Sequence, residues 1–166
     1  MREIFSRHKN AFIVICVILL IYVPVAISMG SLRPFAVVSS ESMLPVLSRG
    51  DLILIKSSPT NSLNVGDIIV FDVPSPYDKI IPSPVIHRIV NKEVGHFETK
   101  GDNNPQPDIF DVPAGNVIGS YMGIRMPFLG HFFLFIQSPI GLAMIILLII
   151  VWSVYSYFMA KEKKVY

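Results

Sequence analysis

Three polar clusters in the middle of the chain carry the residue types that amide hydrolysis needs. They supply a hydroxyl at Ser42, an imidazole at His87 and carboxylates at Asp102 and Asp108. A serine hydroxyl is a poor nucleophile at neutral pH and needs a base within hydrogen-bond reach, and histidine, with an ordinary pKa of about 6.5, suits that work. A carboxylate that accepts the other ring N–H would fix the tautomer and stabilise the imidazolium. The sequence therefore offers the parts of a serine hydrolase.

Each of these residues also has a purely structural explanation. Ser42 could be a loop hydroxyl, His87 a core histidine bonded to a backbone carbonyl, and Asp102 the residue that closes a turn. A non-enzymatic, membrane-anchored β-domain that holds or presents substrates is therefore one alternative. A serine–lysine mechanism with Lys79 or Lys92 as the base is another, although Lys79 falls in a proline-rich loop, which is a poor place to desolvate an ammonium.

No metal or other cofactor is expected. The four histidines are scattered along the chain, and the single cysteine, Cys16, lies inside an apolar run. Neither a thiol cluster nor an H-E-x-x-H spacing accompanies them. The serine mechanism outlined above needs neither a metal nor another cofactor.

The composition indicates a membrane protein. Hydrophobic residues make up 52% and charged residues only 16% of the 166 residues, which is unusual for a soluble domain. Residues 11–29 are uncharged, and at about 1.5 Å per residue such a run crosses roughly 30 Å of hydrocarbon. Residues 139–159 are uncharged as well. We predict transmembrane helices at 11–30 and 139–159, the first a retained anchor because it is longer than the core of a cleaved secretory signal.

The charge distribution predicts how these helices are oriented. Both flanks, residues 1–10 and 160–166, are basic, and such flanks stay preferentially in the cytoplasm. Residues 31–138 then form an extracytoplasmic domain. Between the flanks we count eight basic against ten acidic residues, so there is no broad basic face for nucleic acid. A channel or transporter is disfavoured, because the two spans carry no internal charge.

The extracytoplasmic part has the pattern of β structure. Short runs rich in Ile, Val, Phe and Tyr alternate with turn residues, and they lie at 52–56, 68–73, 85–90, 96–100 and 117–124. We predict a mainly β catalytic domain, with mixed or antiparallel sheets in a partly open barrel. Residues 125–137 are apolar but interrupted by Gly130 and His131, and they form either an interfacial segment or an early start of the second span.

Three motifs carry a resemblance to a known family. S-x-S-M-x-P at 40–45, I-H-R-I at 86–89 and K-G-D-N-N at 100–104, followed by Asp108, resemble in order and spacing the blocks of type I signal peptidases of the archaeal and endoplasmic-reticulum branch. The resemblance covers residues 36–123. It implies a membrane-bound serine endopeptidase that removes signal peptides by cutting after small residues through an acyl-enzyme. The bacterial branch has a lysine base where this chain has His87, so Ser-His-Asp chemistry is implied.

The same resemblance assigns roles to individual residues. It makes Ser42 the nucleophile and His87 the general base. It places one important aspartate at Asp102 and a second at Asp108, and we expect Asp108 to be the triad acid, with Asp102 supporting the site. The implied oxyanion donors are the backbone N–H of Ser42 and the hydroxyl of Ser40. Glu41, between the two serines, should point to solvent.

The expected partners are the signal peptides of preproteins and the lipid bilayer of the cell membrane, or of the endoplasmic reticulum in a eukaryote. Ser42 lies 12 residues beyond Gly30, which keeps it within roughly 40 Å of the bilayer. A preprotein could add a strand to a sheet edge and place small side chains in small pockets, for which Val38, Ile86 and Phe35 are candidate lining residues. The resemblance leaves open whether other membrane subunits or a translocon take part.

Overall fold

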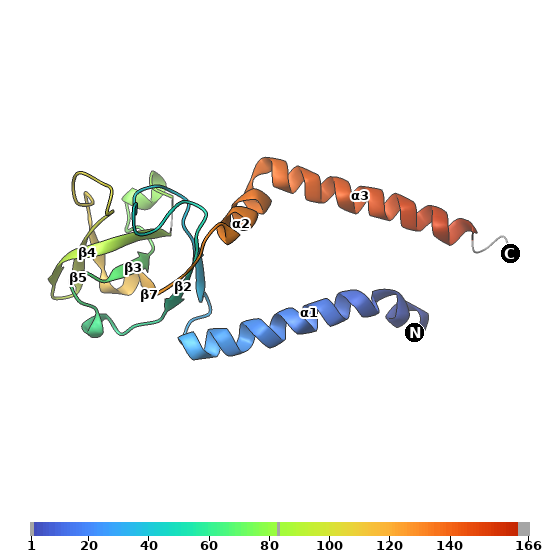
Figure 1. Cartoon of the computed structure of the whole chain (residues 1–166), viewed down its shortest axis with the longest axis horizontal. Coiled ribbons are helices and arrows are strands. Elements are labelled where there is room, and N and C mark those ends of the chain that lie inside the picture. The colour runs from blue at the N-terminus through green and yellow to red at the C-terminus, as the bar shows by residue number, and fades with distance from the viewer. Residues whose placement is uncertain (1, 83, 163–166) are drawn as a thin grey trace.

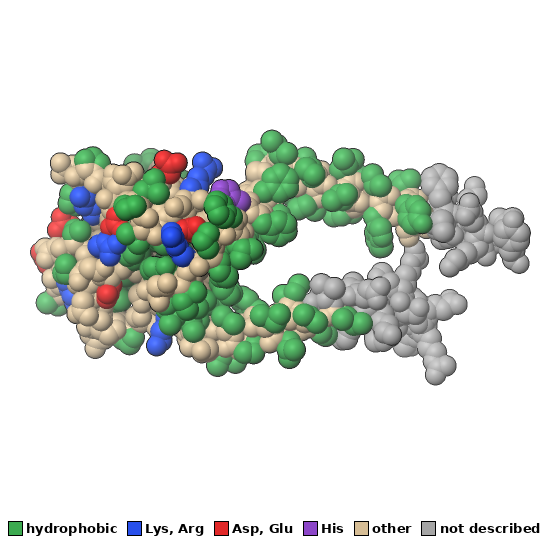
Figure 2. Space-filling model, viewed as in Figure 1, with side chains coloured by type: hydrophobic (Ala, Val, Ile, Leu, Met, Phe, Trp, Pro, Cys, Tyr) green, Lys and Arg blue, Asp and Glu red, His purple; other side chains and the backbone are tan. Residues whose placement is uncertain are grey.

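The computed structural model describes residues 2–82 and 84–162, with side chains at residues 13, 16–82 and 84–156. Two long helices, α1 (Arg2–Met29) and α3 (Pro139–Glu162), leave a β domain on the same side (Figure 1). Hydrophobic side chains cover the described parts of both helices, whereas the visible Lys, Arg, Asp and Glu side chains lie on the β domain (Figure 2). The chain therefore divides into a water-compatible β part and an apolar helical part.

One helix meets the length and hydropathy of a membrane span within the described side chains. It is α3, in which Pro139–Ser156 is an 18-residue apolar stretch with almost no burial. In α1 the corresponding stretch, Cys16–Met29, is shorter. Most of the side chains at 11–15, and those of both basic flanks, lie outside the described residues. The second predicted span is thus matched in length and composition, and the first only over Cys16–Met29.

Within the described residues, seven strands form a single sheet that curves into a half-barrel. Its spatial order is β1-β2-β7-β3-β4-β5-β6, and every pair is antiparallel. The strands are β1 (Phe35–Val37), β2 (Leu52–Lys56), β3 (Ile68–Phe71), β4 (Val85–Glu93), β5 (His96–Lys100), β6 (Asp111–Pro113) and β7 (Val117–Met126). The five predicted strands are confirmed, and of the two predicted sheet types the antiparallel one is found.

Strand β3 separates two hydrophobic clusters. Successive side chains of a strand point to opposite faces; Ile68 and Val70 lie in the cluster that also holds Met43, and Ile69 and Phe71 lie in the other. Because both faces are covered, β3 is apolar at every position and does not alternate. The first cluster contains the side chains next to Ser42, and the second lies behind His87.

Residues 125–137 prove to be partly strand and partly a separate helix. Strand β7 continues to Met126, and α2 (Leu129–Gln137) follows. Ser138 ends α2 in an extended conformation, and its Oγ accepts the N–H of Gly141 at 3.0 Å, which makes it the N-cap of α3 with a proline at the first helical position. The alternative of an early start of the second span is therefore wrong. The interfacial position of α2 stays a prediction.

Candidate active site

Ser42 lies in the connection between β1 and β2, residues 38–51. Val38 donates its N–H to Asp51 O at 2.9 Å and accepts the N–H of Gly50 at 2.8 Å, which closes the base of the loop. Met43 and Leu47 are buried in the core. Apolar side chains on both sides of the turn therefore fix the loop, while Ser42 remains half-buried at the surface.

The base of this loop is also held by a charged side chain. The carboxylate of Asp51 is buried, accepts the N–H of Ser48 at 2.9 Å and lies 3.3 Å from the guanidinium of Arg125. Arg125 also donates to Val46 O at 3.1 Å. Buried carboxylates need such partners, and here the partners link the loop to β7.

His87 lies on β4, opposite Ile69 of β3. Its neighbour Ile86 points into the first cluster, so the imidazole points to the other face, where the ring of Phe71 meets it edge-on at 6.4 Å between centroids. The residue is 8% exposed. Burial on a strand leaves the ring few orientations, which is what a base that must reach one hydroxyl requires.

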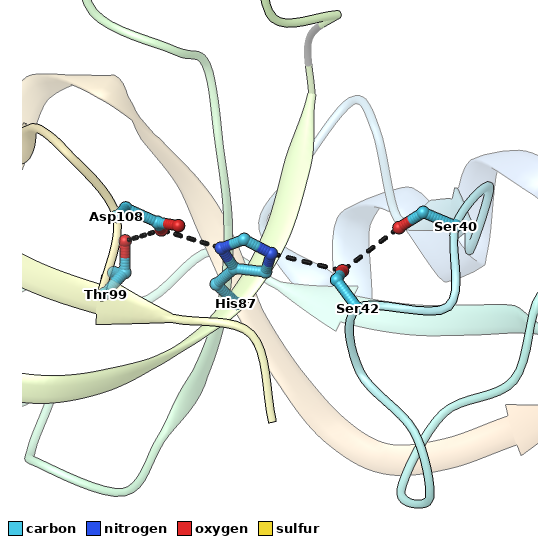
Figure 3. Close-up of polar contacts among 5 residues, drawn as sticks. All are labelled: Ser40, Ser42, His87, Thr99 and Asp108. Atoms are coloured by element: carbon cyan, nitrogen blue, oxygen red, sulfur yellow. Dashed lines mark hydrogen bonds and ion pairs between the residues drawn. The ribbon is translucent and has the colours of Figure 1, made fainter. Parts of the chain in front are cut away.

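The structure brings Ser42, His87 and Asp108 together in one row (Figure 3). Ser42 Oγ lies 3.1 Å from His87 Nε2, and His87 Nδ1 lies 2.7 Å from Asp108 Oδ2. Both distances are hydrogen-bond distances. The arrangement can transfer a proton from the hydroxyl to the imidazole and stabilise the positive charge that results.

Thr99 is the contact of this row that sequence reasoning missed. It is fully buried on β5, and its Oγ1 donates to Asp108 Oδ2 at 2.6 Å, while its carbonyl accepts the Asp108 N–H at 2.8 Å. Thr99 thus holds both the carboxylate and the backbone N–H of Asp108. The available signal was strand alternation, which places Thr99 on the same inward face as Phe97, where a hydroxyl needs a partner.

Asp102 is placed against Arg88. Its two carboxylate oxygens accept from Arg88 Nε at 2.7 Å and Nη2 at 2.6 Å, and hydrogen bonding to this carboxylate raises the pKa of Arg88. Arg88 Nη1 also donates to Gly66 O at 2.7 Å. A bidentate ion pair of this kind fixes the relative orientation of the two side chains in addition to neutralising their charges. Asp102 therefore anchors the turn at 101–104 to β4.

That turn contacts Ser42 directly. The N–H of Asn103 donates to Ser42 O at 2.8 Å, and Asn103 Nδ2 donates to Glu41 O at 3.3 Å. A Cβ at Gly101 would lie 2.7 Å from the same Ser42 carbonyl, so only glycine allows this approach. The pair of Arg88 and Asp102 therefore acts on the backbone of Ser42 through the turn.

The remaining predicted residues surround Ser42. Ser40 Oγ lies 3.0 Å from Ser42 Oγ and is exposed, as is Glu41. An open hollow of about 430 Å³ begins at the two serines. Its lining residues are Val37, Val38, Ser39, Ser40, Ser42, Met43, Ile81, Pro82, Pro84, Val85, Ile86, His87 and Asn104. Val38 and Ile86 are among them, and Phe35 is not.

Of the two alternative bases, Lys92 is bonded to backbone carbonyls, and neither lysine lines the hollow at Ser42. Lys92 Nζ donates to the carbonyls of Leu63 at 2.5 Å and Asn61 at 3.1 Å, and Lys79 lies in a short 3-10 helix, Tyr77–Lys79, of the proline-rich loop. Among the residues that the structure describes, no group of three or more His, Cys, Asp and Glu side chains could hold a metal ion.

Comparisons with known proteins identify the family. Residues 9–95 match the family model described as signal peptidase, peptidase S26. The signal peptidase complex catalytic subunit SEC11 of Tuber melanosporum is 32% identical over 150 residues, 78% of this chain and 77% of that protein. The SEC11 subunit of Chaetomium globosum is 32% identical over 142 residues (78% and 79%). Human SEC11C is 31% identical over 112 residues (64% and 56%).

The family model covers more than half of the chain, and the first of these relatives covers more than two thirds of it. The chain therefore belongs to the signal peptidase family, peptidase S26. It is a serine endopeptidase that removes signal peptides.

Proposed function

We propose that Ser42, His87 and Asp108 are the catalytic triad of this signal peptidase. The observation that carries the proposal is the unbroken chain of contacts from Ser42 Oγ through both ring nitrogens of His87 to Asp108 Oδ2. In this row His87 lies between the hydroxyl of Ser42 and the carboxylate of Asp108 and contacts each through a different ring nitrogen (Figure 3). Asp102 has its own partner in Arg88 and acts as a supporting residue.

The reaction follows from these contacts. His87 Nε2 takes the proton of Ser42 as Oγ attacks the carbonyl carbon of the peptide bond, and Asp108 accepts the Nδ1 hydrogen bond of the resulting imidazolium. His87 then gives the proton to the leaving amine, and the acyl group stays on Ser42 as an ester. Water, activated by the same imidazole, hydrolyses the ester and restores the hydroxyl.

The oxyanion of the tetrahedral intermediate needs donors close to Ser42. We assign this role to the backbone N–H of Ser42 and the hydroxyl of Ser40. The Ser40 hydroxyl is 3.0 Å from the oxygen that attacks, and it is exposed toward the hollow rather than buried. Preformed donors aimed at the developing charge contribute large rate effects, on the order of 100- to 1,000-fold for one donor.

Specificity for small residues before the cut is assigned to the hollow beside Ser42. Val38, Met43 and Ile86 lie in its wall and belong to the first core cluster, so the wall is both apolar and tightly supported. Residues Val85–His87 pair with β3 on one side, whereas the described pairing with β5 starts only at Arg88. An extended peptide can add to this open edge and place alternate side chains in the hollow.

We further propose that both helices are membrane spans, with both termini in the cytoplasm and residues 31–138 on the opposite side. The two helices leave the β domain on one side (Figure 1), as this topology requires. The named relatives are catalytic subunits of a signal peptidase complex, and on this basis we propose that this chain works beside other membrane subunits in the membrane where preproteins are translocated.

Cleavage of a model preprotein in detergent tests the proposal. We expect Ser42→Ala and His87→Ala to fold and to lose cleavage. Matched controls are Ser62→Ala and His96→Ala, because both residues are exposed and lie outside the hollow, and we expect them to cleave as the wild type does. Activity that survives in both Ser42→Ala and His87→Ala would refute the triad.

A further inference from the structure

A second open hollow lies on the other side of His87. It measures about 330 Å³ and is lined by Ile81, Val85, His87, Asn104, Gln106, Pro107, Asp108, Ile109 and Phe110. We call it the acid-side hollow, and the hollow that begins at Ser40 and Ser42 the serine-side hollow. The two share Ile81, Val85, His87 and Asn104. Together they form a surface that continues past the catalytic histidine in both directions.

The reaction chemistry assigns different parts of the substrate to the two hollows. The carbonyl oxygen of the cut bond must lie near its donors, which we place at Ser42 and Ser40. The leaving nitrogen must lie near His87 Nε2, because His87 protonates it. In Figure 3 Ser40, Ser42, His87 and Asp108 follow one another in a row. The peptide that follows the leaving nitrogen therefore continues across His87, away from Ser40, toward the acid-side hollow.

The acid-side hollow has the chemistry of a side-chain site. Most of its wall is hydrocarbon, and Phe110 at its back is held by the rings of Phe71 and Tyr77, at 6.3 Å and 5.3 Å between centroids. The amides of Asn104 and Gln106 supply donors and acceptors that suit a peptide backbone. Ile109 is 70% exposed although it directly follows the triad acid. Apolar side chains exposed beside a reactive centre are typical of substrate-binding surfaces.

We propose that the acid-side hollow binds the first residues of the mature protein, those that follow the cut, and that Ile109 gives it a preference for an apolar side chain. This inference rests on the proposed triad, because the triad determines which side of His87 the leaving group occupies. It makes the enzyme selective on both sides of the cut, small residues being required before it and apolar residues favoured just after it.

The test compares preproteins that differ only in the first two residues after the cut, carrying either leucine or serine there. The readout is the ratio of kcat/KM for the two substrates, since a general loss of catalysis cancels in a ratio. We expect the wild type to favour leucine and Ile109→Asn to reduce that ratio about tenfold, as loss of an apolar contact in a specificity pocket does. Ile109→Lys should in addition favour an acidic residue at the same place.

The matched control is Val94→Asn, because Val94 is also an exposed aliphatic residue, 99% exposed in the β4–β5 turn and outside both hollows. Its ratio should equal that of the wild type. An unchanged ratio in Ile109→Asn, or an equal change of the ratio in Val94→Asn, would overturn the inference. Cleavage by Ser42→Ala on the same substrates would instead refute the triad, so the two failures are distinguishable.

Discussion

Asp102 and Asp108 lie in one connection, between β5 and β6, yet the fold places their carboxylates against different partners. Asp108 contacts His87, and the two side chains are each only 10% exposed. Asp102 contacts Arg88, and the side chain of Asp102 is 16% exposed and that of Arg88 31%. In the proposed triad, the first contact involves His87, which changes charge during the reaction, and the second joins two charges that do not change. We therefore expect Asp108 to take part in the chemistry and Asp102 to support the loop around it.

The supporting atoms follow the same division. Asp108 is held by the hydroxyl and the carbonyl of one buried residue, Thr99. Asp102 holds a turn whose backbone N–H at Asn103 reaches the carbonyl of Ser42. Loss of Asp108 should therefore change the rate of the chemical step. Loss of Asp102 should change where the nucleophile lies and how stable the turn is.

The largest effect is expected from Asp108→Asn. The amide keeps the size of the side chain but favours the wrong histidine tautomer, and such a change lowers kcat by about 10⁴-fold in a serine triad. KM should change much less than kcat, because the amide keeps the size of the side chain that lines the acid-side hollow. Steady-state cleavage of a model preprotein measures both constants. The assignment of the acid to Asp108 and of the supporting role to Asp102 is contradicted if Asp108→Asn keeps full activity while Asp102→Asn is inactive.

A smaller but still large effect is expected from Asp102→Asn. Without the carboxylate, Arg88 loses its two charged hydrogen bonds and the turn at 101–104 loosens, so Ser42 is displaced; a shift of this kind can cost up to about 100-fold in rate. The variant should also unfold at a lower temperature than the wild type. Asp108→Asn, in contrast, should lose rate with little change in the unfolding temperature. Thermal unfolding in detergent, measured beside activity, separates the two. Wild-type activity and stability in this variant would remove Asp102 from the account.

Thr99→Val tests how Asp108 is positioned. Valine fills the same space without the hydroxyl, so Asp108 Oδ2 loses one of its two donors, and we expect kcat to fall about tenfold, which corresponds to about 1.4 kcal/mol in the barrier. Thr99→Ser keeps the hydroxyl and should restore most of the rate. If the serine and valine variants are equally slow, Thr99 contributes only packing.

The smallest effect is expected from Arg88→Lys. Lysine keeps the charge but cannot form the two parallel hydrogen bonds of a guanidinium. Asp102 should then hold the turn less firmly, and the activity should decrease by less than the Asp102→Asn variant shows. Measuring kcat for Arg88→Lys and Asp102→Asn side by side shows which variant loses more activity. A larger loss in Arg88→Lys than in Asp102→Asn would mean that Arg88 acts through its other contact, Gly66 O.

Much of the fold could be predicted because its signals are local. The run at 52–56 and the run at 96–100 coincide with β2 and β5, since β-branched and aromatic residues between turn residues are typical of strands. Strands β1 and β6 were missed because each is three residues long and is held by its partner rather than by its own pattern. The break before α3 was readable in Ser138 and Pro139, an N-cap followed by a proline.

The site was predictable in its residue types but less so in its contacts. Spacing and resemblance singled out Ser42 and His87, and the resemblance led us to expect Asp108 as the acid, but no local rule distinguishes the two aspartates of this loop. The choice depends on the N–H of Asp108, which bonds to Thr99 O and turns that carboxylate toward β4. Such a contact joins two elements, so neither segment alone records it. The acid-side hollow was missed for the same reason, because its wall combines β4 with the loop that follows β5.

The most direct test of the triad measures, without any substrate, how strongly His87 and Asp108 affect the reactivity of a thiol at position 42. In a Cys16→Ala background, the Ser42→Cys variant carries a single thiol, and a neighbouring imidazolium lowers the pKa of such a thiol and speeds its alkylation. We predict that adding His87→Ala or Asp108→Asn slows alkylation at neutral pH by about tenfold or more, and that adding Asp102→Asn slows it less. Equal alkylation rates in all four proteins would contradict the account.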